Sequence, residues 1–209
     1  MTVYYSSIKK GAEIFANSLA TSTPVPGNLR RPVYLAALNA DPAGTVSALK
    51  REWFTTRTAD AKETILQAIG STPDASIVSS VLLPFMFNSH PPAPAEDAVA
   101  TSDMFFMANS LANNRVARPL LWAYTRDHWD QLLAKLGGNL ILLDRVLNFA
   151  LPQFTDYEAV ADIDKFFSGV DTRGFDRTLE KAKDMIRARA AYRLRDATEL
   201  AKWLQDNGY

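Results

Sequence analysis

Residues 5–19 read Tyr5-Ser-Ser-Ile-Lys-Lys-Gly-Ala-Glu-Ile-Phe-Ala-Asn-Ser-Leu19, with apolar side chains at spacings of three and four. Tyr5, Ile8, Ala12, Phe15 and Leu19 would therefore form one stripe along an α-helix. The same spacing recurs along most of the chain, and no segment alternates apolar and polar residues as a half-buried strand does. The pattern predicts an all-α fold.

Turn and capping residues divide the chain into about ten or eleven helices. We expect helices over residues 5–19, from Asn28 as a cap, from Asp41-Pro42, over 59–69, from Asp74 to Phe87, and over 104–111, 115–136, 140–149 and 157–167, then after Gly174 and over 196–204. Short turns between such helices favour stacked pairs, an α-α superhelix with degenerate HEAT/armadillo-like repeats. We expect one domain over residues 1–209, with a proline-rich exposed loop at 89–100.

Composition excludes several classes of function. Lys+Arg and Asp+Glu number 23 each, so the chain as a whole has no electrostatic attraction to nucleic acid or to an anionic membrane. The chain has no cysteine, which excludes disulfides, thiolate zinc sites, iron–sulfur clusters and cysteine nucleophiles. The N-terminal residues lack the pattern of a signal peptide, and the apolar runs are too short to span a bilayer. We expect a soluble, cytoplasmic protein without nucleic acid or membrane partners.

Three blocks of sequence resemble a known family. They are Asn28-Leu-Arg-Arg-Pro-Val-Tyr34, then Asn114-Arg-Val-Ala-Arg118 with the following Leu-Leu-Trp122 and His-Trp-Asp130, and then Gly174-Phe-Asp-Arg-Thr-Leu-Glu180 with Ile186-Arg-Ala-Arg189 and Trp203-Leu204. In order and spacing they resemble the C-terminal helical-repeat domain of zinc aminopeptidases of the alanyl/puromycin-sensitive type. The tail over residues 201–209 is similar to that of a fungal member. Arg115 and Ala117 stand where the family pattern has proline and glycine.

The resemblance does not extend to the family's catalytic residues. Zinc in these enzymes needs two histidines one helical turn apart, a glutamate between them and a second glutamate ligand. This chain has only His90 and His128, with neither a His-Glu-x-x-His motif nor the Gly-x-Met-Glu-Asn segment that holds the substrate amine. We therefore expect no metal, no cofactor and no zinc peptidase activity from these residues.

The first functional interpretation is a non-catalytic module that binds a peptide or a partner protein on its concave face, as the resemblance implies. Arg118 lies in an otherwise apolar helix start and needs a carboxylate or backbone carbonyls if it is buried. Either it makes a structural helix-end contact, or it binds a ligand carboxylate from the concave face with help from Arg30. Of Arg30 and Arg31, one is expected to face the groove and the other water. The expected groove walls are Tyr34 and Trp122, and the remaining ligand-binding candidate is Asn114.

The second interpretation treats the chain as a complete gene product that has lost peptidase activity and catalyses a different reaction. A helical pocket rich in Trp, Phe and Met would shape a small apolar, secondary-metabolite-like substrate for metal-free isomerisation, cyclisation or hydrolysis. The candidate catalytic groups are His128, Asp127 and Tyr124, with Arg118 in support. Asp127 and His128 gain nothing from adjacency, because neighbours on a helix point apart.

Further alternatives are a structural scaffold and a fragment whose partner is a missing catalytic domain. A polar, arginine-lined groove would favour peptide binding, and a closed apolar cavity would favour the enzyme. A broad exposed apolar face would favour the missing partner domain.

Overall fold

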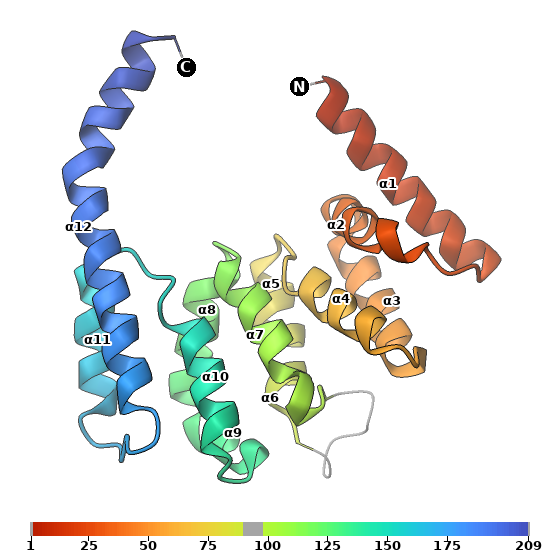
Figure 1. The fold of residues 1–209 in the computed structure, drawn as a ribbon. Coiled ribbons are helices and arrows are strands. Elements are labelled where there is room, and N and C mark those ends of the chain that lie inside the picture. The colour runs from red at the N-terminus through yellow and green to blue at the C-terminus, as the bar shows by residue number, and fades with distance from the viewer. Residues whose placement is uncertain (1, 90–97, 209) are drawn as a thin grey trace. The chain divides into compact units, whose positions relative to one another are not determined.

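The computed structural model describes residues 2–89 and 98–208, with side chains from residue 6 onward. Every regular element in these residues is helical, which confirms the predicted all-α fold (Figure 1). Among the same residues, no helix combines the length and apolar content that crossing a bilayer requires.

The helices follow one another with short connections. Their bounds are α1 Thr2–Thr21, α2 Arg30–Ala40, α3 Pro42–Thr55, α4 Ala59–Ile69, α5 Ala75–Ile77, α6 Leu83–Phe87, α7 Met104–Asn113, α8 Ala117–Asp127, α9 Trp129–Leu136, α10 Leu140–Ala150, α11 Tyr157–Phe167 and α12 Asp176–Asp206. Single turns of other helix types lie at η1 Gly27–Leu29, η2 Val78–Leu82 and η4 Thr101–Asp103.

The chain forms two compact units, Met1–Gly138 and Asn139–Tyr209. Within the first unit, α1 packs on α2, α2 on α3 and α4, α3 on α4, α4 on α7, and α7 on α8. Packing between neighbours in the sequence is what stacked helix pairs require. The prediction of one domain over the whole chain remains a prediction.

The core of the first unit is aromatic and aliphatic. Tyr34 and Phe85 are fully or almost fully buried, at 0% and 1% exposure. Phe15 meets Tyr34 edge to face with ring centroids 5.7 Å apart, and Trp53 meets Phe85 in the same way at 5.9 Å. Such contacts add to the free energy gained from burying apolar area.

A proline explains the irregular helix between Asp74 and Phe87. Pro84 has no N–H, and in an ideal α-helix its ring would strike the carbonyl of Ser80. The chain widens into the π-helical turn η2, in which the Leu83 N–H bonds to Val78 O. The predicted helix from Asp74 to Phe87 is therefore continuous but changes type in its middle.

Three predicted helix boundaries were wrong. Asn28 does not cap a helix, because it lies inside the short turn η1 and α2 begins only at Arg30. The predicted helix 115–136 is broken at His128 into α8 and α9. The two helices expected after Gly174 are one, since α12 runs for 31 residues without an internal glycine or proline.

The predicted exposed loop at 89–100 is wrong at its C-terminal end, and its residues 90–97 lie outside the described residues. Ala98 and Val99 are each only 1% exposed, and the Val99 N–H donates to Phe85 O at 2.8 Å. Lys135 on α9 donates to Asn88 O at 2.6 Å and to Val99 O at 2.7 Å. These bonds hold both described flanks of the proline-rich segment against the first unit.

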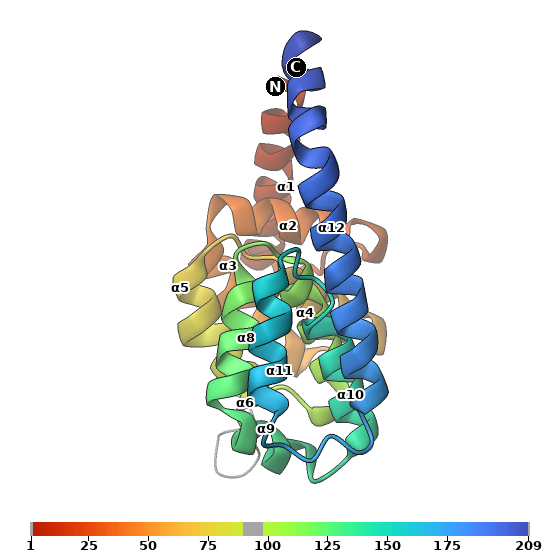
Figure 2. The same cartoon turned by 90° about the vertical axis from the view of Figure 1, so that its left-hand side faces the viewer.

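The second unit contains α10, α11 and α12. Leu143, Leu147 and Ile163 are at most 1% exposed and form its core with the first half of α12. Asn139 caps α10 by accepting from Leu142 N, and Asp156 caps α11 by accepting from Ala159 N. Figure 2 shows the same helices after a quarter turn, with α12 continuing past the ends of α10 and α11 in both views.

Candidate functional site

Polar side chains form one face of α4 in the first unit. Glu63, Gln67 and Ser71 follow one another at intervals of four residues, so they project from the same side of the helix and the turn after it. The Gln67 Nε2 donates to Glu63 Oε1 at 2.9 Å, and the Ser71 hydroxyl donates to Gln67 O at 3.0 Å.

A second polar face runs along α7, which is otherwise apolar. Asn109 and Asn113 are four residues apart, as are Ser110 and Asn114. Asn113 Nδ2 donates to Asn109 O and to Asn109 Oδ1, at 2.9 and 3.0 Å. The opposite side of α7 carries Met107 and Leu111, both fully buried. The helix is therefore amphipathic, with amides and a hydroxyl facing out of the core.

The two polar faces meet because α4 and α7 approach closely at Gly70 (Figure 1). A Cβ on Gly70 would lie 2.7 Å from both Cβ and Oγ of Ser110. The Ser110 hydroxyl donates to Gln67 O, and its oxygen lies 3.2 Å from the Ser71 hydroxyl. A glycine and a serine thus allow the helices to touch and to share hydrogen bonds at the contact.

Asn114 ties the end of α7 to the turn after α4. Its Nδ2 donates to Gly70 O at 3.1 Å and to Thr72 O at 2.7 Å, while its Oδ1 accepts from Val116 N at 3.0 Å. These bonds occupy both of its N–H groups and its oxygen. Asn114 is therefore an anchor of the site in this structure, and its predicted role in ligand binding remains a prediction.

Together these residues line a polar groove, hereafter the α4/α7 groove, with a volume of about 410 Å³. Its lining residues are Arg31, Gln67, Ser71, Asn109, Ser110, Asn113 and Asn114. Arg31 is the charged member of this set, and its Nη1 donates to Gln67 Oε1 at 3.2 Å. A guanidinium has five N–H donors, so donors remain that can reach a ligand.

The chemistry of the α4/α7 groove suits a polar ligand with an anionic group. Amides such as Asn113 offer both a donor and an acceptor, as a peptide backbone does. Arg31 adds a positive charge with the planar geometry that matches a carboxylate. The lining residues include two serine hydroxyls, but no histidine, lysine or carboxylate is among them.

The arginines predicted for the site take different places. Arg30 is turned to Asp60, with Nη1 and Oδ2 3.5 Å apart, whereas Arg31 lines the groove. The sequence predicted that one of these two arginines would face the groove and the other water, and it named Arg30 as the ligand-binding residue. That role of Arg30 remains a prediction. Arg118 donates from Nε to Ala112 O at 2.9 Å, a contact with the last turn of α7, and its predicted role in binding a ligand carboxylate remains a prediction.

The expectation that Tyr34 and Trp122 form groove walls is wrong, because both are buried. Tyr34 is fully buried and its hydroxyl donates to Glu52 Oε1 at 2.9 Å. Its burial, together with the Glu52 carboxylate, raises the pKa of the Tyr34 hydroxyl. Trp122 is 4% exposed, with the Arg126 guanidinium 5.6 Å from its ring centroid.

The three catalytic candidates lie near the junction of α8 and α9, and none of them lines the α4/α7 groove. His128 stacks on Tyr124 with ring centroids 3.7 Å apart, and its Nδ1 lies 3.0 Å from Tyr124 O. Burial raises the pKa of the Tyr124 hydroxyl, while Asp127 is exposed. His128 thus contacts the end of α8, and its predicted catalytic role remains a prediction.

Metal-binding groups are scattered in the described part of the chain. Over residues 2–89 and 98–208, no three histidine, aspartate or glutamate side chains gather as a metal ion would require. His90 lies outside those residues.

The sequence profile of one family, described as the ERAP1-like C-terminal domain, matches residues 4–188. The chain belongs to this family. The all-helical fold and the three blocks identified in the sequence agree with that assignment.

Relatives of this ERAP1-like C-terminal domain are aminopeptidases. The alanine/arginine aminopeptidase of Saccharomyces cerevisiae is 32% identical over 114 residues, which is 54% of this chain and 13% of the relative. Aminopeptidase 2, mitochondrial, of the same yeast is 28% identical over 114 residues, 54% of this chain and 12% of the relative. Aminopeptidase M1-D of Oryza sativa is 25% identical over 190 residues, 88% of this chain and 20% of the relative. The chain thus spans one fifth or less of the length of these proteins.

Sequence reasoning missed most of the polar residues that line the groove of this ERAP1-like domain. The signal was present as two sets of polar residues at intervals of four, Gln67 with Ser71, and Asn109 with Asn113. Each set lies in an amphipathic helix, where amides and hydroxyls usually form the solvent-exposed face and so do not indicate a binding site. Their shared location depends on the contact of Gly70 with Ser110, which one sequence does not reveal.

Proposed function

We propose that this ERAP1-like C-terminal domain binds peptides in the α4/α7 groove, with a peptide carboxylate held by Arg31. The supporting observation is that amide and hydroxyl groups of two helices line the groove together with one arginine. A volume of about 410 Å³ falls in the range of ordinary ligand pockets, roughly 300–1,000 Å³. The relatives are named as aminopeptidases, so a peptide is the ligand class that fits both the lining and the family.

The orientation of the peptide follows from the charges. A peptide has a carboxylate at one end and an ammonium at the other. Arg31 attracts the carboxylate and repels the ammonium, while Asn109 and Asn113 can pair with backbone groups next to it. Asn114 and Ser110 hold the two helices together and keep the groove in shape. The polar lining of the α4/α7 groove does not suit the alternative of an enzyme for apolar substrates.

Binding is tested by fluorescence anisotropy with a fluorescein-labelled nonapeptide mixture that has free terminal carboxylates. The same mixture with terminal amides is the control ligand. We expect the amide to bind about tenfold more weakly, because one charge-assisted contact is worth about 1.5 kcal/mol. Arg31→Gln should weaken binding of the acid by about the same factor and leave binding of the amide unchanged.

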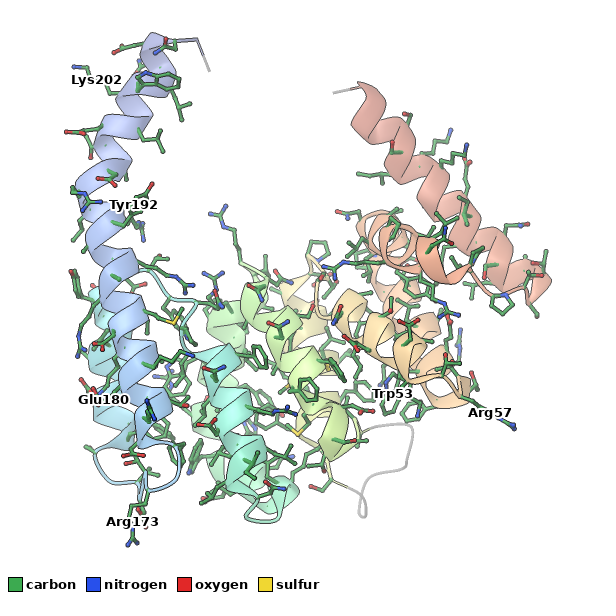
Figure 3. All side chains as sticks on the ribbon, viewed as in Figure 1. Trp53, Arg57, Arg173, Glu180, Tyr192 and Lys202 are labelled. Carbon is green, nitrogen blue, oxygen red and sulfur yellow. The ribbon has the colours of Figure 1, made fainter. Side chains whose placement is uncertain are left out.

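The matched control is Arg57→Gln. Arg57 is exposed in the turn before α4, at the opposite end of that helix from Gln67 and Ser71, and Figure 3 shows it projecting away from the helices. This variant removes the same charge and should leave binding unchanged. Equal binding of acid and amide to the parent chain would contradict the proposed role of Arg31, and absence of binding of both would contradict a peptide function.

A further inference from the structure

The apolar stripe of α12 continues beyond the core of the second unit. Leu179, Ile186 and Ala190 are at most 5% exposed and face α10 and α11. Residues seven apart share a face of a long helix, so Leu200 continues the row of Leu179 and Ile186, and Leu204 continues that of Ala190. Leu200 is 51% exposed and Leu204 is 37% exposed.

This stripe has no cover within its own unit. α12 has 31 residues and is about 46 Å long, whereas α10 and α11 have 11 residues each and are about 17 Å long. Figures 1 and 2 show the second half of α12 running past both helices, and Figure 3 marks Tyr192 and Lys202 on it. Tyr192 and Trp203 are 59% and 55% exposed. Apolar side chains gathered in this way mark an interaction surface.

A groove lies at the base of the exposed stripe, with a volume of about 470 Å³. Thr155, Tyr192 and Leu200 are among its lining residues, together with two arginines, Arg189 and Arg193. We name it the α12 groove. It places a mainly apolar surface beside positive charge.

The charges of the α12 groove are unbalanced toward positive. Asp196 is its acidic lining residue, and Arg195 already engages that carboxylate with Nε to Oδ1 at 2.6 Å. Arg193 Nη1 reaches only the neutral Thr155 hydroxyl at 3.4 Å. Arg189 Nη1 is buried and has no hydrogen-bond partner among the described residues. A buried guanidinium nitrogen without an acceptor costs free energy, so a partner carboxylate that bonds to Arg189 would stabilise a complex.

We propose that the α12 groove docks an acidic amphipathic helix of a partner protein. Leucine-like side chains of that helix would cover Leu200 and Leu204, and a glutamate or aspartate would bond to Arg189 and Arg193. A helical partner suits this surface because heptad spacing along α12 offers holes for side chains from a second helix. This site is separate from the α4/α7 groove and does not depend on the proposed peptide function.

Charge distinguishes this partner from two other occupants. A second copy of the chain would bring Arg189 and Arg193 again without a surplus carboxylate. A membrane would have to accept Arg193 and Asp196 within the apolar face. An acidic helix alone supplies both the apolar cover and the missing negative charge.

The test uses two fluorescein-labelled 21-residue helical peptides with leucine at heptad positions a and d. One has glutamate at e and g, and the other has lysine there, so that like charges keep each peptide from pairing with itself. Anisotropy with the full chain should show the acidic peptide binding at least about tenfold more tightly than the basic one. Leu200→Asp should weaken binding of the acidic peptide by about tenfold or more, and Arg189→Gln by about fivefold.

Thr198→Asp is the matched control, because Thr198 is exposed on the opposite face of α12 and should leave binding unchanged. Circular dichroism of Leu200→Asp should match the parent, since Leu200 lies outside the core. Equal binding of the two peptides, or no binding of either, would overturn the proposal. Light scattering that shows a dimer lost in Leu200→Asp would assign the stripe to a second copy, and binding to phosphatidylcholine/phosphatidylserine vesicles would assign it to lipid. Either result would also overturn it.

Discussion

At the scale of single residues, the contact between Gly70 and Ser110 makes the α4/α7 groove possible. A side chain on Gly70 would place its Cβ 2.7 Å from Ser110 Cβ and 3.2 Å from Leu111 N. Because part of this clash is with backbone, α7 would have to move. Such a shift would pull Ser110 away from Gln67 O and widen the groove.

Gly70→Ala should therefore lower the free energy of unfolding by about 1–3 kcal/mol through overpacking. The measurement is urea unfolding of the full chain followed by tryptophan fluorescence. Gly27→Ala is the control, because nothing lies within 4 Å of a Cβ built at Gly27. A Gly70→Ala variant as stable as the parent would contradict this prediction, because it would show that α7 shifts without a loss of stability.

The half-buried ammonium of Lys135 should make the free energy of unfolding depend on pH. Burial lowers the pKa of its ammonium from 10.5 to about 8. Between these two values the unfolded chain binds more protons than the folded chain, so this residue makes stability rise with pH from about 8 to about 10.5. After allowing for partial solvation, we expect a gain of about 1 kcal/mol between pH 7.5 and 9.5.

The tyrosines do not change the stability between about pH 7.5 and 9.5. Burial raises the pKa of both Tyr34 and Tyr124, so each lowers stability only above its ordinary value of 10.0. Thermal unfolding of the parent and of Lys135→Met at both pH values isolates Lys135. The rise should disappear in the variant, and a parent whose stability is flat or falls over this interval would contradict the account.

At the scale of elements, the helices that sequence reasoning located best are those with strong end signals. The predicted helices 59–69 and 157–167 match α4 and α11 at both ends. The break at His128 was missed because neither glycine nor proline marks it. There the chain leaves the helical conformation at φ −122° and ψ 32°, and the His128 ring turns back to Tyr124 O. A bond between a side chain and its own helix end leaves no periodic signature.

The cap of α11 gives a prediction at this scale. Asp156 accepts from Ala159 N at 3.0 Å, so Asp156→Ala should destabilise the second unit by about 1 kcal/mol. Asp156→Asn keeps an effective cap and should stay near the parent. Native-state hydrogen exchange of the α11 amides is the measurement. Identical exchange in the alanine and asparagine variants would show that the cap does not stabilise this helix.

At the scale of the whole molecule, hydrophobic spacing was enough to predict an all-α fold, and residue blocks were enough to predict the family. The division into two units was not predicted, because it depends on which helices pack together. Hydrophobic spacing also did not predict which aromatic side chains are buried. Tyr34 and Trp122 lie on amphipathic helices beside polar residues, and the packing of the helices decides which side chains face the core.

The central claim is that the α4/α7 groove receives a peptide carboxylate at Arg31. The most direct measurement is an NMR titration that follows the side-chain amide signals of Gln67, Asn109 and Asn113 in the full chain. We predict that these signals shift with a free-acid nonapeptide at about tenfold lower concentration than with its terminal amide, and that in Arg31→Gln the acid requires about the same concentration as the amide. Signals that stay fixed, or that move equally with acid and amide, would contradict the claim.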